Sequence, residues 1–562
     1  MTRFRVLTIA LLIVTFAGTA SAQTRWLDQF LERYKPPKVD PAASVTPQVS
    51  DEPWRLMVNQ GVLPLSVNDV IRLMLASNLD VTVNRFSPLA NQYVLQTLFQ
   101  PFEPTLNISA QAARNTTPPT SQLQVGTGGA VPFSQLSHRY SVGYGQTLQS
   151  GTILGVNAVV NRNSSNSLFN TFNPAYFGTL TYSVSQPFFR NYGRAINGWQ
   201  IRIGKNNVNI SEIGFEMQTI DLVTAAENLY WDFVYQREDI KVHQQALALS
   251  EKTLADNKRQ VQIGTMARIE VVQAESEVAQ RQFQMVTTTY TADQTQDQVK
   301  KLITNLGDPA LVLAQLSPLN PLPQPDESDI MPLEESVKYA LESRPELRQL
   351  ALQEQNGDVA MQYAKNQLLP ALIVGASYTQ NGVGGVQTNR SGLGGSQVSV
   401  IQGGLVDAFG QLFGYNYTGY TVGFNIAIPL SNKAEQAIYA KALSDKQVVA
   451  ARRTQVLQQI ALEVRNAHSV VVMNRARIQT AEKALELAMM QSEAEQKKFQ
   501  LGNSQLRFVL QEQRNVTDAQ TARNLALVSY AKALVTYDKA IGRTLRKNNV
   551  EIEKQLQVAG KL

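Results

Sequence analysis

The 562-residue chain contains no cysteine. It therefore cannot form a disulfide, a thiolate metal site or a catalytic thiol. The same absence excludes a lipoprotein anchor attached to an N-terminal cysteine. Long apolar runs are also missing after the first residues, because no later segment approaches the twenty apolar residues that a membrane-spanning helix needs. If this chain enters a bilayer, it must do so as a closed β-barrel, which also pairs every backbone group in lipid.

Residues with catalytic chemistry are sparse. The three histidines, His138, His243 and His468, lie far apart in the sequence and are expected to be surface residues of a loop and two helices. Glycine-rich phosphate-binding signatures are absent, and the net charge of +6 is spread among acids without a basic stripe. The sequence therefore predicts no enzyme activity, no metal, no cofactor and no nucleic-acid partner.

The N-terminus has the pattern of a secretory signal peptide. Arg3 and Arg5 precede the apolar run of residues 6–16, and the small residues Ala20, Ser21 and Ala22 follow. This order predicts cleavage before residue 23 and export from the cytoplasm. A membrane anchor is the alternative, although the apolar run is short for one.

The chain contains an internal repeat. An offset of 266 residues carries Pro104 onto Pro370 without a gap, and an offset of 238 carries Gly264 onto Gly502. A proline-rich segment from Ser317 separates the two halves. The expected boundaries are a signal peptide (1–22), an N-terminal extension (23–64), a first repeat (65–306), a linker (307–332), a second repeat (333–547) and a C-terminal tail (548–562).

Each half changes period twice. A short helical stretch is followed by segments of about ten alternating residues next to Pro104, Pro187, Pro370 and Pro429. These segments have the length of tilted transmembrane strands. A long Gly-, Asn- and Ser-rich loop is expected at 381–416. Residues 140–162 of the first half read as an extra hairpin turning at Ser150-Gly151, and whether it joins a barrel wall is left open.

After the strand segments of each half, apolar residues are spaced seven positions apart. Apolar residues recur every seven positions from Ala226 to Val261 and, after the glycine, from Val271 to Leu306. The second half repeats both rows from Val464 and from Val509, with Arg523 interrupting the last row. Such heptads predict long helices packed lengthwise. About sixty helical residues would reach roughly 90 Å, which suits a tube better than a globular core.

This doubled order of helix, strands and long helical hairpin resembles the TolC family of outer-membrane efflux proteins, the outer-membrane factors of tripartite efflux or type I secretion systems. The hairpin turns around Gly264 and Gly502 look like the periplasmic tips of that family, and the segments around Pro187 and Pro429 look like its strand-to-helix joints. The resemblance implies an α+β membrane protein. Its expected form is a trimeric β-barrel of about four strands per chain, with an extra hairpin as an open option, continued by a long α-helical barrel.

The resemblance also implies function and partners. It predicts a passive outer-membrane channel subunit, a homotrimer in the lipid bilayer with a periplasmic helical portion. An adaptor and an inner-membrane pump would be its partners, and the cargo would be small molecules or polypeptides. A secreted or envelope-spanning coiled-coil protein or adhesin is the alternative, because it would explain the heptads and the signal peptide equally well.

Site residues follow from the resemblance position by position. The tip candidates for adaptor docking are Gly264, Arg268, Ile269, Gly502 and Arg507. The constriction candidates are Phe508, Gln511, Phe499 and Glu270. Many family members place acids where this chain has Phe508 and Gln511, so an apolar constriction at Phe508 is one hypothesis. The other is that Phe508 and Phe499 simply pack between helices.

Overall fold

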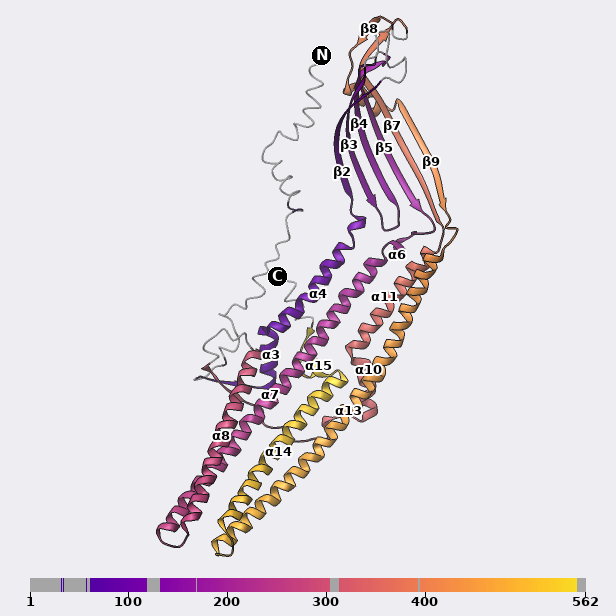
Figure 1. Cartoon of the computed structure of the whole chain (residues 1–562). Helices are drawn as coiled ribbons and strands as arrows, with labels where there is room; N and C mark the ends of the chain where they lie inside the picture. Colours follow the sequence, from indigo (N-terminus) through magenta and orange to yellow (C-terminus); the bar gives the residue numbers. More distant parts are fainter. Residues whose placement is uncertain are drawn as a thin grey trace.

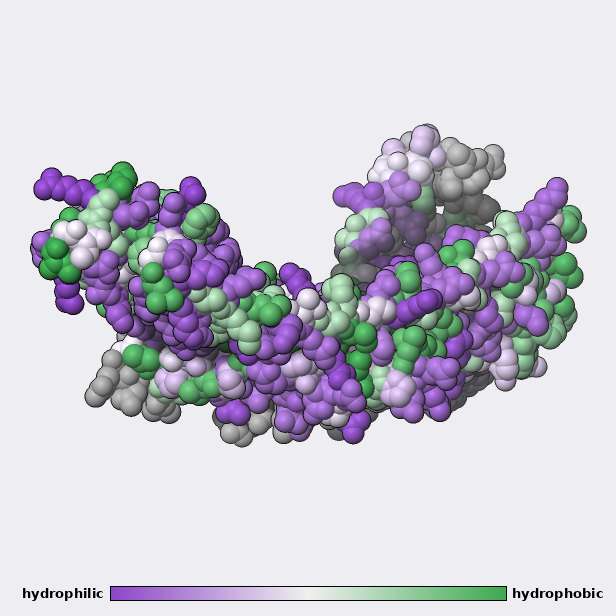
Figure 2. Space-filling model, turned by 90° about the horizontal axis from the view of Figure 1, so that it is seen from below, coloured by the Kyte–Doolittle hydropathy of each residue, from purple (hydrophilic) through white to green (hydrophobic). Residues whose placement is uncertain are grey.

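The computed structural model describes residues 32, 34, 57, 61–118, 132–167, 169–303, 313–392 and 395–552. The expected signal peptide lies outside this part, as do Leu306, most of the expected N-terminal extension and much of the C-terminal tail. The molecule is long and narrow, with the strands at one end and the tips of two helical hairpins at the other (Figure 1). Viewed from the hairpin end, it is a curved wall that is hollowed on one side (Figure 2).

The elements of the first half follow in this order: β1 (Val62–Leu65), α3 (Val67–Ser77), α4 (Leu79–Thr97), the 3-10 turn η3 (Gln100–Phe102), β2 (Thr105–Thr117), β3 (Phe133–Thr147), β4 (Ile153–Ser165), β5 (Phe172–Pro187), α6 (Arg194–Asn197), α7 (Trp199–Gln262) and α8 (Arg268–Ile303). The short helices begin at defined caps. Ser66 and Asp69 form a capping box at α3, and the Asn78 side chain accepts from the first backbone amides of α4.

The second half begins with β6 (Gln315–Pro318) and the 3-10 turn η5 (Glu327–Asp329). It continues with α10 (Leu333–Ser343), α11 (Pro345–Gln367), β7 (Ala371–Arg390), β8 (Gln397–Ile401), α12 (Leu405–Phe413), β9 (Tyr417–Ala427), α13 (Lys433–Gln500), α14 (Leu506–Ile541) and α15 (Thr544–Lys547). Strand β6 lies in the proline-rich linker and pairs in parallel with β1. A two-stranded sheet tolerates these prolines because each strand has a free edge.

The heptad residues form the helical core. Ala226 and Phe233 of α7 are buried against α3 and α8, and Val464 and Val471 of α13 are buried against α14. Val299 of α8 is likewise fully buried. Burial weakens along the rows toward the hairpin tips, where Val261 and Phe499 are only partly covered. Lengthwise packing therefore holds each helical hairpin together, as the seven-residue spacing indicates.

The described strands other than β1 and β6 form one antiparallel sheet in the order β2-β3-β4-β5-β7-β8, with β9 also paired to β7. The expected hairpin at 140–162 is present as β3 and β4, which turn at Gly151 and lie between β2 and β5 in this sheet. Each long strand thus pairs with its neighbours over ten or more residues. Within the described chain, β2 pairs with β3 alone and β9 with β7 alone.

Two sequence expectations about this region are wrong. The strands are longer than about ten residues, since β7 alone has 20. The expected loop at 381–416 contains the end of β7, β8 and helix α12. The glycines of this segment explain the difference, because a Cβ on Gly382 would lie 2.0 Å from the carbonyl oxygen of Ala408. Glycine here permits a helix to lie directly on a strand.

The four expected joint prolines stand at strand ends. Pro104 and Pro370 come directly before β2 and β7, Pro187 ends β5, and Pro429 follows β9 by two residues. None of these positions requires a donor within a central strand. Across the described residues, every helix is too short or too polar to cross a lipid bilayer.

Candidate functional site

One face of the sheet is apolar across all six long strands. The register places Leu106, Tyr144, Val156, Tyr182, Tyr378 and Tyr420 in one row, each opposite the next. Because side chains alternate along a strand, the even-numbered residues share this face. Its other exposed apolar members include Ile108, Val142, Val184, Val422, Phe424 and Ile426. These named side chains are exposed within the described chain, so this part of the sheet presents a continuous apolar surface.

The opposite face is predominantly polar. Ser109 and Ser141 share a hydrogen bond of 2.7 Å between their hydroxyls, and Thr181 and Thr379 lie 3.3 Å apart in the same way. The Thr179 hydroxyl donates to the Asn381 side chain at 3.3 Å. Alternation of an apolar and a hydrated face is the arrangement of a sheet with lipid on one side and water on the other.

The joints between sheet and helices are tied by side chains that the sequence does not single out. The Arg190 guanidinium follows β5 and donates to Gln367 of α11 at 2.7 Å and to Glu435 of α13 at 2.9 Å. The Asn432 amide donates to the carbonyl oxygen of Leu368 at 3.0 Å. The ends of β5 and β9 are therefore both fastened to the end of α11, the helix that leads into β7.

Each helical-hairpin tip turns at a glycine with positive φ. Gly264 has φ 76° and Gly502 has φ 75°. At the first tip, the amide of Thr265 donates to the carbonyl of Gln260 and that of Gly264 donates to Val261. The second tip repeats this pattern one repeat later. Paired bonds of this kind are a Schellman motif, which closes a helix through a left-handed residue and explains why glycine stands there.

The docking candidates cluster at these turns. Arg268 and Ile269 begin α8, and Arg507 lies in the first turn of α14. All three side chains are exposed in the single chain. The tips therefore present cationic and apolar groups at the end of the molecule that is farthest from the sheet (Figure 1).

The constriction candidates are placed differently from one another. Phe508 is 46% exposed, and the Arg507 guanidinium carbon lies 4.6 Å from the centre of its ring. Gln511, one turn further, is exposed and donates to Asn515 at 3.0 Å. Phe499 instead packs on Ala274, Leu506 and Leu510. Glu270 is half-buried in the first turn of α8.

A buried ion-pair cluster joins the two hairpins close to the tips. Glu277 of α8 is 2% exposed and accepts from Arg281 Nε at 2.8 Å. Its second carboxylate oxygen accepts from both Nε and Nη2 of Arg514 in α14. Hydrogen bonding to Glu277 raises the pKa of Arg514. This contact connects the first half to the second, in addition to the Asp232–Lys532 and Asp221–Lys539 ion pairs between α7 and α14.

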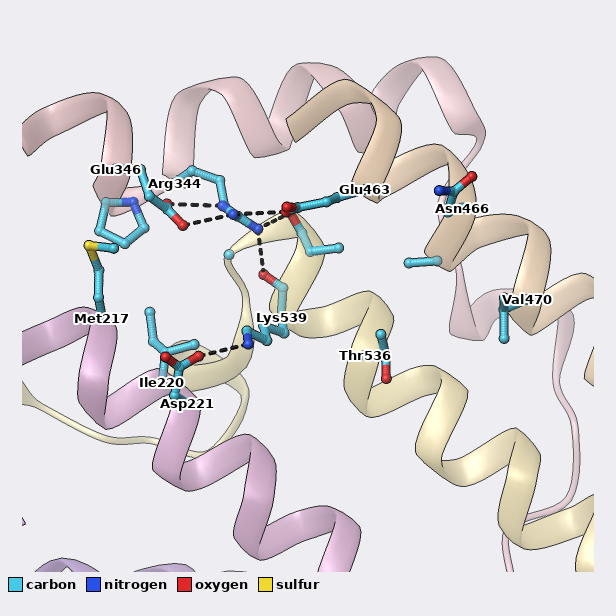
Figure 3. Close-up of a pocket in the computed structure, with 14 residues that line it drawn as sticks. Met217, Ile220, Asp221, Arg344, Glu346, Glu463, Asn466, Val470, Thr536 and Lys539 are labelled. Carbon is cyan, nitrogen blue, oxygen red and sulfur yellow. Dashed lines mark hydrogen bonds and ion pairs between the residues drawn. The ribbon is translucent and has the colours of Figure 1, made fainter. Parts of the chain in front are cut away.

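A second cluster occupies the middle of the helical wall. A cavity of about 550 Å³ lies between α7, α11, α13 and α14, and Figure 3 shows its lining. Arg344 binds Glu346 through Nε and Nη2 at 3.0 and 2.7 Å and also reaches Glu463 of α13 at 3.1 Å. Its Nη1 donates to the carbonyl of Ala540 at 3.1 Å. A cation at this position stabilises the C-terminal end of α14.

Charge is also buried where α14 ends. Asp538, 2% exposed, accepts from Arg543 and Lys547 at 2.6 Å each. Burial raises the pKa of the neighbouring Glu227 carboxyl, while the charge of Lys547 opposes that effect. The Lys547 contact fastens α15 to α14, and the Asn548 amide, directly after α15, donates to Glu227 of α7 at 3.2 Å. Among the residues that the structure describes, no three His, Asp or Glu side chains converge as a metal site.

The family model of outer membrane efflux proteins matches residues 70–305 and 337–543. The chain belongs to this family. The match spans both halves and confirms the resemblance to TolC-type outer-membrane factors that the repeated hairpins indicate. The family is one of outer-membrane channels, which favours the channel over the adhesin alternative.

Solved structures share the fold. The Campylobacter jejuni CmeC outer membrane channel has a TM-score of 0.59 and 16% identity, with 90% of this chain and 91% of that chain covered. The Vibrio cholerae outer membrane protein VceC has a TM-score of 0.57 and 13% identity, with 85% and 96% covered. A Pseudomonas aeruginosa membrane protein has a TM-score of 0.58 and 13% identity, with 86% and 91% covered. No curated protein matches the sequence.

The Glu277 cluster predicts a large difference between two neighbouring carboxylates. Glu277→Ala leaves the buried Arg281 without its carboxylate partner and should lower the free energy of unfolding by about 3–5 kcal/mol. Glu275→Ala removes an exposed pair with Lys258 and should cost about 0.2–1 kcal/mol. Denaturant titration followed by the helical circular dichroism signal compares the two. Equal losses would contradict the structural role of Glu277.

Proposed function

We propose that three copies of this chain form a passive export duct across the outer membrane. One observation carries the proposal: the six long strands of the seven-stranded sheet share one apolar face, and within the described chain the outer edges of the long strands β2 and β9 are unpaired. Unpaired backbone groups cannot remain exposed to lipid. Pairing β2 of one copy with β9 of the next would satisfy both edges and close a barrel.

The strand directions support this closure. Strands β2, β3, β4, β5, β7 and β9 alternate in direction, so β9 of one copy would meet β2 of the next in an antiparallel pair. The six strands comprise the four of the family pattern and the β3–β4 hairpin. Three copies would therefore supply eighteen strands. We assign this architecture to an internal duplication, with repeats at 65–306 and 333–547 joined by the linker.

The helices offer a second surface for assembly. Helix α8 has an exposed apolar stripe made of Ile269, Val272, Phe283, Val286 and Tyr290. Spacings of three, eleven, three and four residues, each close to a whole number of helical turns, place these side chains on one side of the helix. A helix of a neighbouring copy would cover it, and four helix positions per chain would give a twelve-helix tube below the barrel.

The remaining assignments follow from this arrangement. A cleaved signal peptide at 1–22 would deliver the chain to the periplasm, and the barrel would lie in the outer membrane. The hairpin tips would contact a periplasmic adaptor, through which an inner-membrane pump supplies the energy. The duct itself needs no catalytic group and no cofactor. Its cargo would be small molecules or polypeptides.

Edge pairing predicts a specific crosslink between subunits. The offset that maps Pro104 onto Pro370 also maps Ser109 onto Gly375, which pairs with Gly423. Ser109→Cys combined with Gly423→Cys should therefore give disulfide-linked oligomers up to a trimer in oxidised membranes. Because the chain has no native cysteine, only the introduced cysteines can form disulfides between its copies.

The neighbouring positions Thr421 and Asn425 cover a shift of register by two residues. Ser109→Cys with Ser183→Cys is the control, since β5 is separated from β2 by two strands. Crosslinks in the control alone, or a dominant dimer, would exclude edge-to-edge closure.

The tips predict a loss of docking on charge reversal. Arg268→Glu combined with Arg507→Glu should abolish export and co-isolation of the adaptor from native envelopes, while the trimer stays intact. The matched control is Arg452→Glu with Arg477→Glu, two exposed positions on α13 away from the tips. Unchanged export by the tip variant would place docking elsewhere.

The last functional prediction concerns Phe508. If three Phe508 rings line the constriction, they disfavour hydrated ions by dewetting. Phe508→Asp should then raise single-channel conductance and create a preference for cations. If Phe508 packs between subunits instead, the same change buries an unpaired charge, which should lower trimer stability by several kcal/mol.

One bilayer recording and one thermal melt separate these two outcomes. Phe508→Leu is the control, because it keeps an apolar side chain without adding charge. Normal stability together with unchanged conductance would exclude both interpretations and make Gln511 the next candidate.

A further inference from the structure

Helix α12 lies on the apolar face of the sheet. A Cβ on Gly384 would lie 2.2 Å from the carbonyl oxygen of Gly404, and one on Gly178 would lie 3.3 Å from Leu412. Gly178 is even-numbered and shares its face of β5 with Leu180 and Tyr182. The helix therefore occupies the face that the proposed function assigns to lipid.

The contact between α12 and the sheet is close and specific. Ala408 and Leu412 of the helix are buried against β5 and β7. Gln411 accepts at 3.0 Å from the backbone amide of Val383, beyond the last β7–β9 pair at Asn381. The helix thus covers β7 where β9 has ended, and it is fixed by both apolar and polar contacts.

The outward side of α12 is apolar as well. Val406 is 36% exposed and Phe413 is 65% exposed. Tyr415 and Tyr417, which follow the helix, are 65% and 57% exposed. A nine-residue helix with one apolar side on the sheet and large apolar groups on the other would be costly in water. Aromatic residues of this kind gather at the boundary of a membrane.

The apolar face of the sheet becomes polar near helix α12. On the face that holds Leu106 and Ile108, the strands become polar at Arg114, His138 and Arg162. His138 is opposite Arg162, Arg162 is opposite Tyr176, and Tyr176 is opposite Gly384, under the start of α12. The end of α12, at Leu412, lies over Gly178. Gly178 is two residues from Tyr176 along β5, on the side of the apolar residues Leu180 and Tyr182.

We propose that α12 is an interfacial helix that contacts lipid at the outer rim of the barrel. Phe413 and Val406 contact the acyl chains of the outer leaflet, while Asp407 and the row from His138 to Arg162 lie at the level of the headgroups. An apolar helix side at the boundary between acyl chains and headgroups is the usual position of such a helix. This inference rests on the proposed function, because it requires the sheet to lie in a bilayer.

The test uses single nitroxide labels, which the absence of native cysteine makes straightforward. Val406→Cys and Phe413→Cys report on α12. Phe424→Cys marks the apolar face of β9, and Asn425→Cys marks its polar face. The labelled protein is reconstituted in vesicles of phosphatidylethanolamine and phosphatidylglycerol. Relaxation by oxygen, which concentrates in lipid, is compared with relaxation by a water-soluble nickel chelate.

The expected result is a several-fold higher ratio of oxygen to chelate accessibility at Val406 and Phe413 than at Asn425, with Phe413 deeper than Val406. Chelate accessibility at both α12 positions, with Phe424 still in lipid, would overturn the inference alone. Protection from both reagents would also overturn it, since protein would then cover the helix. Chelate accessibility at Phe424 itself would overturn the proposed function. Migration as a heat-resistant trimer shows that each labelled variant is folded.

Discussion

Backbone hydrogen bonding at the edges of a lipid-exposed sheet is the constraint on which this structure depends. The strands satisfy one another from β2 to β9, but the outer groups of these two strands have no partner within the described chain. Water could hydrate such edges, and lipid could not. The apolar face from Leu106 to Tyr420 points to lipid. Under the proposed function a single copy would therefore be incomplete, and its edges would determine how copies join.

Side-chain contacts also fix the position of the strands relative to the helices. Arg190 fastens the end of β5 to α11 and α13, and Arg344 fastens the α10–α11 turn to α13 and α14. Both guanidiniums hold several acceptors at once, which a planar donor group does well. Further down, Glu277 connects the hairpins through Arg514. Polar contacts therefore hold the helices together at three levels along their length, and the hairpin tips lie beyond the Glu277–Arg514 contact.

The sequence predicts those elements that follow from a repeat spacing or a single residue type within a short segment. Heptads from Ala226 and Val464 predict the long helices, and Gly264 and Gly502 predict the turns, because a left-handed position needs glycine. The sequence does not predict helix α12, although Leu405, Ala408, Phe409 and Leu412 have helical spacing, because the surrounding Gly and Asn residues indicate a loop. The Glu277–Arg514 contact joins residues 237 apart, and no local pattern reveals such a pair.

The additional hairpin has a geometric consequence for the assembly. Twelve helices spaced about 8–10 Å apart would give a tube with a circumference of roughly 96–120 Å. Twelve strands about 4.8 Å apart and tilted by about 40° would give a circumference of only about 75 Å, whereas eighteen would give about 113 Å. With β3 and β4 in the wall, the proposed barrel and tube would have matching circumferences. The chain can then pass from strand to helix with little change of radius at Pro187 and Pro429.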